Sequence, residues 1–350
     1  MARIVGLDIG GANLKAATHE GELRCQPFPL WQRPDDLKES LRELVSTLGP
    51  PPDLVAITMT GELADCFETR HEGATFIIDQ VEDAFPDALI RIWMTSSEFA
   101  EPDDARELTS LVAAANWHAL ATWVARTVPT GPAILLDIGS TTTDIIPLLD
   151  GAPNHSGATD LERLISGELL YTGAGRTPIC AVLPAVTLRS APVPLAAELF
   201  ATTLDAHILQ GNVSENPQDT TTADGRPATK ENSRNRLAHM VCCDHTDLDE
   251  QDLLAMAEQV VAAQTRQIVS ALERILKRCE HQAKKPAVIL SGSGDFLARN
   301  VVETAGVSRF SHIYELAKMY RSDVSQSACA FAVARLAAER CLHDLIPEAT

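Results

Sequence analysis

The sequence predicts an α/β protein of two domains, and three observations support this prediction. The chain has 350 residues, which is enough for two domains that each bury a core. Apolar runs typical of strands alternate along the chain with helical patterns. One strand–turn–strand motif occurs twice, as "VGLDIGGANLKAAT" (5–18) and "LLDIGSTTTDIIPL" (135–148), with Asp8 and Asp137 at matching positions.

The expected elements follow from local patterns of apolar and turn residues. Apolar runs bounded by turn residues predict strands, and apolar residues three and four apart predict helices. In chain order, the pattern predicts a hairpin over 3–9 and 12–18, a helix over 35–49, strands over 53–60 and 88–95, long helical sequence over 104–128, a second hairpin from 133, an amphipathic helix over 251–283, a buried strand entering a Gly-rich turn over 286–296 and an Ala-rich helix over 325–342. Gly49 and three prolines end the first helix, and a Ser cap begins the last.

The segment 211–236 contains Gly, Pro, Asn and Thr throughout and hardly any apolar side chain. We expect it to form a long surface loop that contributes nothing to a core. Lys230, Arg234 and Arg236 give this segment a local positive charge in an acidic protein. They belong either to a solvated loop or to a lid that contacts an anionic substrate.

The composition argues against several classes of partner. A formal net charge of −19, from 29 Lys and Arg against 48 Asp and Glu, disfavours binding to nucleic acids and to anionic membranes. No apolar run approaches the roughly 18 residues of a membrane span, and the N-terminus enters a strand directly, so we expect a cytoplasmic protein. Eight scattered cysteines without a CxxC pair favour reduced thiols. The cluster His239, Cys242, Cys243, Asp244 and His245 is either a polar turn or a metal site.

The turn of each repeated hairpin has the composition of a phosphate-binding loop. Gly10-Gly11 and Gly139-Ser140 have little or no side chain, so their backbone N–H groups can face a phosphate. Asp8 and Asp137 lie at the ends of the preceding strands, and a carboxylate beside a polyphosphate is repelled unless a cation lies between them. We therefore expect both aspartates to bind Mg²⁺, through its water molecules.

Further polar groups belong to the same motifs. Lys15 and the hydroxyls of Thr141, Thr142 and Thr143 add hydrogen-bond donors, and a third Gly-rich turn, Ser291–Asp295, follows a buried strand. Each hairpin by itself is also compatible with a plain β-turn between apolar strands. The sequence has no GxxxxGK[ST] motif, which excludes a P-loop.

Together, "LDIGGANLK", "LDIGSTTTD" and the third turn resemble the phosphate motifs of the superfamily of actin, Hsp70 chaperones and sugar kinases, with Ala12 where a hydroxyl residue is frequent. The resemblance implies two ribonuclease-H-like domains that face each other across a central cleft lined by the three turns. The first domain would comprise residues 1–128 plus 325–350, and the second residues 131–324. The residues that the resemblance implies for polyphosphate binding are Gly10, Gly11, Asn13, Gly139, Ser140, Thr141, Thr142, Asp144, Ser291, Gly292, Gly294 and Asp295.

Four less general stretches resemble a narrower group. These are "TGELADCFETRHEG" (60–73), "AAANWHALATW" (113–123), "SGELLYTGAGRTPI" (166–179) and "RNRLAHMVCCD" (234–244). They resemble hydantoinase/oxoprolinase-like proteins of tetrahydromethanopterin-linked C1 transfer, a group similar to a methanofuran-biosynthesis enzyme. That enzyme joins an aminomethylfuran-methyl diphosphate to the phenol of γ-glutamyltyramine and releases diphosphate. The resemblance implies that the cleft holds a diphosphate ester, so the expected partners are a small-molecule diphosphate and a phenolic acceptor.

The implied reaction assigns roles to particular side chains. Lys15, with Mg²⁺ at Asp8 and Asp137, would stabilise the charge of the departing diphosphate. The phenol, with an ordinary pKa of about 10, needs a base, and the candidates are three polar residues of the family-like stretches. Those candidates are Glu62, Asp65 and His118, and Arg176 is a candidate for binding the glutamyl carboxylates.

Each of these four residues also has a structural interpretation. Glu62 and Asp65 are equally compatible with carboxylates at a helix start, His118 with a packed histidine and Arg176 with a surface loop. Two other functions also remain open. An ATP-dependent small-molecule kinase or amide hydrolase would use the same three turns, and so would a non-catalytic nucleotide-binding protein.

Overall fold

The computed structural model describes residues 2–279 and 284–345, and their contacts divide them into two compact units. Unit 1 contains the described residues of 1–135, 146–166 and 314–350. Unit 2 contains residues 136–145 and the described residues of 167–313. The domain boundaries expected from the sequence stay a prediction.

Unit 1 contains a six-stranded sheet in the order β3-β2-β1-β4-β5-β6. Its strands are β1 (Ile4–Ile9), β2 (Asn13–Thr18), β3 (Leu23–Pro27), β4 (Leu54–Met59), β5 (Leu89–Trp93) and β6 (Phe99–Ala100). The predicted first hairpin is β1 and β2, whose antiparallel register places Asp8 opposite Lys15. β4 runs parallel to β1 and places Thr58 beside Asp8. Every residue of β1 and β4 is buried, which explains why both strands are nearly continuous apolar runs.

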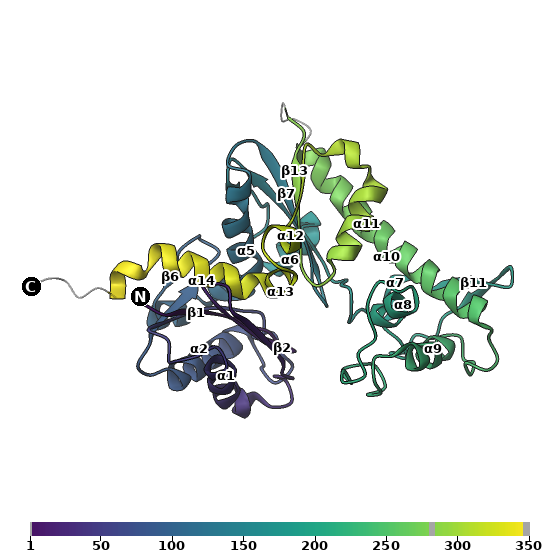
Figure 1. The fold of residues 1–350 in the computed structure, drawn as a ribbon, viewed down its shortest axis with the longest axis horizontal. Coiled ribbons are helices and arrows are strands. Elements are labelled where there is room, and N and C mark those ends of the chain that lie inside the picture. The colour runs from purple at the N-terminus through teal and green to yellow at the C-terminus, as the bar shows by residue number, and fades with distance from the viewer. Residues whose placement is uncertain (1, 280–283, 346–350) are drawn as a thin grey trace, which may run out of the picture. The chain divides into compact units, whose positions relative to one another are not determined.

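The two faces of β1 pack against different helices, as the alternation of side chains along a strand requires. Val5, Leu7 and Ile9 belong to one hydrophobic cluster with α1 (Leu37–Ser46) and α2 (Arg70–Ala84). Gly6 faces the other way, toward α14 (Ala328–Arg340). A β-carbon at Gly6 would lie 2.7 Å from the backbone nitrogen of Ala334, so the glycine and the alanines let α14 lie directly on the strand (Figure 1).

The long helical sequence predicted over 104–128 is helical for most of its length, but it is divided into several short helices. The segment forms α3 (Pro102–Glu107), α4 (Thr109–Val112), α5 (Asn116–Val124) and the 3-10 turn η2 (Ala125–Thr127). Between α4 and α5 the backbone of Ala113 is extended and that of Ala114 has φ of 49°. The backbone of Ala114 makes a hydrogen bond to the Glu62 carboxyl, a tertiary contact that local helix propensity does not include.

The second sheet has the order β10-β8-β7-β13-β14, with β9 paired to β8. Its strands are β7 (Pro132–Ile138), β8 (Thr143–Leu149), β9 (Ala152–Pro153), β10 (Leu169–Leu170), β13 (Ala287–Ser291) and β14 (Ile313–Glu315). β7 and β8 are the second predicted hairpin, and its tip, residues 136–145, belongs to unit 2. β13 is the buried strand predicted to enter the third Gly-rich turn, and α11 (Asp295–Ala305) follows that turn.

The rest of unit 2 packs around the long helix α10 (Glu250–Cys279), whose expected last four residues, 280–283, lie outside the described residues. A second hydrophobic cluster joins α10 to α7 (Ile179–Val182), α8 (Thr203–Leu209), α9 (Lys230–His239) and the hairpin of β11 (Ala185–Leu188) and β12 (Ala191–Pro194). Figure 1 shows α8 and α9 beside α10.

The remaining short elements belong to both units. They are η1 (Pro34–Asp36), α6 (Asp160–Ser166), η3 (Val307–Arg309), α12 (Leu316–Met319), α13 (Ser322–Gln326) and η4 (Leu342–Leu345). Among the described helices, none combines the length and the apolar character that crossing a membrane requires.

The Ala-rich helix predicted over 325–342 is two helices in the structure. α13 ends at Gln326 and α14 begins at Ala328, with Ser327 between them at φ of −118°. Ser327 is the N-cap of α14 but makes no side-chain cap hydrogen bond. A serine therefore stands at the N-cap of the Ala-rich helix, but at Ser327, since Ser325 at the start of the predicted stretch lies within α13.

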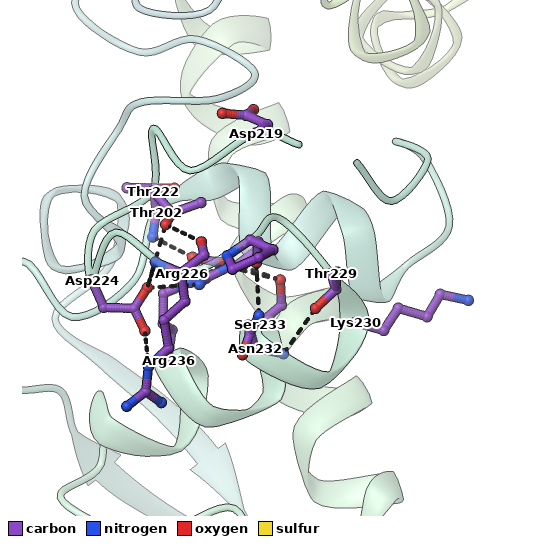
Figure 2. A network of polar contacts seen from close by, with 12 residues as sticks. Thr202, Asp219, Thr222, Asp224, Arg226, Thr229, Lys230, Asn232, Ser233 and Arg236 are labelled. Atoms are coloured by element: carbon purple, nitrogen blue, oxygen red, sulfur yellow. Dashed lines mark hydrogen bonds and ion pairs between the residues drawn. The ribbon is translucent and has the colours of Figure 1, made fainter. Parts of the chain in front are cut away.

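The expectation that 211–236 forms only a surface loop is also wrong. Residues 230–236 are the first seven residues of α9, which Thr229 caps through a hydrogen bond from the backbone of Asn232. Arg236 is 1% exposed and forms an ion pair with Asp205. It forms a second ion pair with Asp224 (Figure 2). The segment has few apolar residues, yet the buried ion pair of Arg236 with Asp205 holds it against α8, and a count of apolar residues misses that pair.

Most of the cations that a lid would need to bind an anionic substrate are already paired with carboxylates of the protein. Arg236 is buried in its ion pairs, and Arg234 is paired with Glu250. Of the three, only Lys230 is exposed and has no ion pair among the described residues, and Figure 2 shows its side chain pointing away from the network.

Candidate active site

The first Gly-rich turn joins β1 and β2 within unit 1. Its Gly10 N–H donates to the carbonyl of Asn13 at 3.0 Å, and a β-carbon at Gly11 would meet no atom within 4 Å. Asp8, 5% exposed, precedes the turn, and its Oδ2 lies 3.8 Å from the Nζ of Lys15. The buried Oδ1 of Asp8 has no hydrogen-bond partner among the described residues. Burial raises the pKa of Asp8, and the charge of Lys15 opposes that rise.

The turn after β4 lies at the end of β1. The backbone N–H groups of Thr60 and Gly61 both donate to the carbonyl of Ile9 at 3.0 Å, because parallel strands bring their carboxyl ends to one edge of the sheet. Glu62 follows these residues and is 1% exposed, and its Oε2 has no hydrogen-bond partner in the described part of the chain. Asp8, near the end of β1, and Glu62, in the turn after β4, therefore lie toward the same edge of the sheet of unit 1.

The environment of Glu62 favours its neutral form. Burial raises the pKa of Glu62 from 4.5 to about 7, and hydrogen bonds from its own backbone and from that of Ala114 limit the rise. Asp160 raises this pKa further and Arg70 lowers it, and these two residues form an ion pair at 3.1 Å.

The other two candidate bases lie in different surroundings. Asp65 is exposed in the turn that follows Glu62. Because α2 begins at Arg70, the interpretation of Glu62 and Asp65 as carboxylates at a helix start is wrong. His118 lies in α5, 2% exposed, and its Nδ1 accepts a hydrogen bond from the Trp93 indole at 3.2 Å. Burial lowers the pKa of His118 to about 3, with smaller effects of nearby positive groups. The imidazole is therefore neutral, and one of its nitrogens is already hydrogen-bonded.

The second and third Gly-rich turns meet in unit 2. The Gly139 N–H donates to the Thr142 carbonyl at 2.9 Å and closes the turn after β7. The Gly294 N–H donates to the Ile138 carbonyl at 2.8 Å. A β-carbon at Gly292 would lie 2.9 Å from the Oδ1 of Asp137, and Gly292 has φ of 98°, so glycine is required for both space and backbone conformation. Asp137 and the Ser291–Asp295 turn are therefore adjacent.

The other residues of unit 2 that the sequence assigned to polyphosphate binding lie in the second turn, on β8 and at the start of α11. Ser140 and Thr141 hydroxyls lie 3.4 Å apart, and Thr142 is half-buried in the same turn. Asp144 is buried on β8, opposite Leu169 of β10. Asp295 begins α11 and is paired with Arg299 at 2.9 Å.

A loop that the sequence did not connect with phosphate binding lies on the second turn. The N–H groups of Ala174, Gly175 and Arg176 donate to the carbonyls of Gly139 and Ser140 at 2.8 to 3.0 Å. A β-carbon at Gly173 would lie 2.6 Å from backbone atoms of Ser140 and Thr141. The only sequence signal for this contact is the "TGAG" pattern, whose two glycines permit a close approach. Arg176 therefore belongs to the surroundings of the second turn, with its side chain exposed.

The predicted site residues thus lie in two groups, one in each unit. In unit 1, Asp8 lies opposite Lys15 before the turn 10–13, and Ile9 and Gly10 contact Gly61, which precedes Glu62. In unit 2, Asp137 and the turn 139–142 lie beside 291–295 and Arg176. Within residues 2–279 and 284–345, no group of three or more His, Cys, Asp or Glu residues is arranged to hold a metal ion. The cluster at 239–245 forms the end of α9 and a following turn.

The comparison with known protein families covers most of the chain. Residues 53–340 match the model of the family described as Hydantoinase/oxoprolinase. The chain belongs to the hydantoinase/oxoprolinase family. This confirms the resemblance seen in the four specific stretches of the sequence.

Two relatives of this family member carry the same name, "(4-{4-[2-(gamma-L-glutamylamino)ethyl]phenoxymethyl}furan-2-yl)methanamine synthase". The relative from Methanocaldococcus jannaschii is 32% identical over 336 residues, covering 95% of this chain and 97% of its own. The relative from Methanococcus vannielii is 32% identical over 203 residues, covering 58% of this chain and 89% of its own.

A solved structure of nucleotide-free acetone carboxylase, from work on ATP-dependent acetone carboxylation, superposes with a TM-score of 0.52 at 11% identity. It covers 91% of this chain, which spans about half (51%) of that protein's length. This likeness concerns the fold alone and agrees with a mixed α/β architecture.

Proposed function

We propose that this protein is a transferase that joins an aminomethylfuran-methyl diphosphate to the phenol of γ-glutamyltyramine, or a close analogue, in the biosynthesis of a methanofuran-type C1 carrier. The observation that carries the proposal is the 32% identity to the M. jannaschii synthase, which extends over nearly the full length of both chains. In this reaction the phenol oxygen bonds to the methylene carbon on the furan. The bond from that carbon to the diphosphate breaks, and its electron pair leaves with the diphosphate.

The leaving group is the part of the reaction for which the Gly-rich turns are suited. Loss of diphosphate develops negative charge on its oxygens, and fixed N–H groups and cations reduce the cost of that charge. We assign this role to Lys15, to the turns 10–13 and 139–142 and to the Ser291–Asp295 turn. The proposal includes that Asp8 and Asp137 face each other across a cleft between two ribonuclease-H-like domains, so that both hairpins contact one diphosphate.

The residues around Asp8 fit a magnesium ion. Its Oδ1 is buried and has no hydrogen-bond partner among the described residues, and burial raises its pKa, so a nearby cation would favour the ionised form. Mg²⁺ is commonly bound by one or two carboxylates together with substrate phosphates and waters, so a cluster of three protein ligands is not needed. We propose that Asp8 and Asp137 hold the ion, which when bound would neutralise charge on the diphosphate.

Glu62 is the candidate whose surroundings best suit a base for the phenol. A pKa of about 7 leaves a substantial ionised fraction at neutral pH and is closer to the phenol's pKa than that of an ordinary carboxyl. His118, with a pKa of about 3, is a much weaker proton acceptor. We therefore propose that Glu62 takes the phenol proton in a complex in which the acceptor replaces the groups that now cover its Oε2. Asp65 and His118 would then shape the acceptor site, and Arg176 would bind a glutamyl carboxylate.

The family description supports a second candidate function. A hydantoinase/oxoprolinase match is compatible with an ATP-dependent amide hydrolase, in which the three turns bind ATP. A small-molecule kinase would use the turns in the same way. The two candidates differ in whether ATP is consumed.

The deciding experiment supplies purified protein and Mg²⁺ with an aminomethylfuran-methyl diphosphate, with and without γ-glutamyltyramine. We expect diphosphate release only when the phenol is present, together with an aryl ether of the corresponding mass, and no use of ATP. Release of ADP that depends on the phenol or on a cyclic amide, without any ether, would reject the transferase and favour the second candidate.

A further inference from the structure

A buried amide supports the loop that lies on the second Gly-rich turn. Gln264 of α10 is 0% exposed. Its Nε2 donates to the Gly173 carbonyl at 2.7 Å and to the Thr172 hydroxyl at 2.9 Å. Gly173 is the residue whose missing β-carbon lets the loop lie against Ser140. A single side chain thus connects the longest helix of unit 2 to the backbone that covers the turn.

The orientation of this amide follows from its partners. The Gly173 carbonyl only accepts hydrogen bonds, so the nitrogen of the amide must face it. The oxygen of the Gln264 amide then lies 3.0 Å from the Nε2 of His207, which must therefore carry the proton. The Nδ1 of His207 is left to accept from the Asn212 side chain at 3.3 Å. Burial lowers the pKa of His207 to about 4, so this neutral tautomer persists at neutral pH.

Burying the polar side chain of Gln264 on an otherwise apolar face of α10 costs free energy that its hydrogen bonds must offset. The neighbouring inward positions of α10 are apolar, including Val260, Ala263, Ile268 and Ala271. An apolar residue in place of Gln264 would fill the space without the cost of burying an amide. The amide instead satisfies a carbonyl that also accepts from the Thr203 hydroxyl at 2.9 Å. The bonds from Gln264 and Thr203, with a longer one from the Thr177 hydroxyl at 3.4 Å, hold Gly173 at one position relative to the Gly139-Ser140 turn.

We propose that Gln264 is a positioning residue that holds the Thr172–Thr177 loop, and through it the Gly139-Ser140 turn, in the geometry that binds a polyphosphate. The loop transmits the restraint because three of its N–H groups bond to the carbonyls of the turn. Those bonds fix the peptide planes of Gly139 and Ser140, and the planes set the direction of the N–H groups that face the phosphate. The inference rests on the proposed function only for the identity of the ligand as a diphosphate rather than ATP.

The test compares two glutamines of the same helix. Gln264→Met keeps an unbranched side chain of similar length and removes the Nε2 group that donates to Gly173 and Thr172. Gln267→Met is the matched control, because the Gln267 Nε2 also donates to a backbone carbonyl at 2.9 Å, that of Val182 at the end of α7. Binding of inorganic diphosphate with Mg²⁺ is measured by calorimetry, and thermal unfolding is recorded for each variant. Thr203→Val removes a second donor to the Gly173 carbonyl with little change of shape, and leaves the longer bond from the Thr177 hydroxyl at 3.4 Å. It gives a milder variant if Gln264→Met does not fold.

We expect Gln264→Met and Thr203→Val each to weaken diphosphate binding by about fivefold or more, and Gln267→Met to stay within about twofold of the wild type. In the transferase assay, KM for the diphosphate substrate should rise while KM for the phenol stays unchanged. A variant that unfolds at a lower temperature but binds diphosphate as the wild type does would overturn the inference, since Gln264 would then be only structural.

The same variants separate this inference from the proposed function. If the wild type binds MgATP but not diphosphate, the series is measured with MgATP. Weaker ATP binding by Gln264→Met would then support the positioning role, although the transferase proposal would fail. A wild type that binds neither ligand would reject the positioning role as well.

Discussion

The buried carboxyl of Glu62 should make the stability of unit 1 depend on pH. Its pKa rises from 4.5 to about 7 on folding, chiefly through burial. At 1.36 kcal/mol for each pKa unit, the ionised form costs the folded state about 3 kcal/mol relative to the neutral form. The folded protein binds the proton more tightly than the unfolded chain between pH 4.5 and 7. This contribution to stability is therefore complete below pH 4.5 and is lost as pH rises through 7.

Glu62→Gln tests this reasoning, because an amide of the same shape stays neutral at every pH. The four tryptophans, Trp31, Trp93, Trp117 and Trp123, all lie in unit 1, so their fluorescence during urea unfolding follows the unit that contains Glu62. The free energy of unfolding of the wild type, relative to that of Glu62→Gln, should fall by about 2.5 kcal/mol between pH 5 and pH 8.

A carboxyl in the same turn provides the control. Asp65 is exposed, so Asp65→Asn should retain the wild-type dependence on pH. If the stability curves of the wild type and Glu62→Gln run parallel from pH 5 to pH 8, Glu62 is not held in its neutral form, and its suitability as a base fails with that result.

Three further predictions concern other parts of the molecule. Gly6→Ala should destabilise unit 1 by about 2 kcal/mol or more in urea unfolding, since its β-carbon would lie within 3 Å of Ala334 and push α14 from β1. Arg236→Met should destabilise unit 2 by about 3 to 5 kcal/mol, measured by hydrogen exchange of α8 and α9, because it leaves the carboxylate of Asp205 buried without its cation. Lys15→Ala should slow diphosphate release in the transferase assay by about a hundredfold or more, because it removes a charge directed at the leaving group.

Each of these results has a contrary outcome. Unchanged stability of Gly6→Ala would mean that α14 does not lie directly on β1. If Arg236→Met shows the same hydrogen exchange in α8 and α9 as the wild type, the ion pair with Asp205 makes no net contribution to the stability of unit 2. A Lys15→Ala enzyme that raises KM for the phenol and keeps its rate of diphosphate release would move Lys15 from the leaving group to the acceptor.

The sequence by itself determined those features whose cause is local. Both hairpins and their turns follow from apolar runs interrupted by Gly-rich pairs, which are properties of fewer than about twenty adjacent residues. The long helix α10 follows in the same way from its apolar spacing. The family could also be read from the sequence, because four separate stretches carry residues specific to it.

Only the tertiary structure decided features that depend on residues distant in the chain. The break at Ala114 arises where its backbone meets Glu62, 52 positions earlier, so helix propensity alone could not place it. Arg236 lies in a polar segment that looked like a solvated loop, because the carboxylate that stabilises its burial belongs to Asp205 on another helix. The contact of the Thr172–Thr177 loop with the Gly139-Ser140 turn has the same origin. Burial and pairing of polar groups depend on which segments fold together, and no local pattern of residues contains that information.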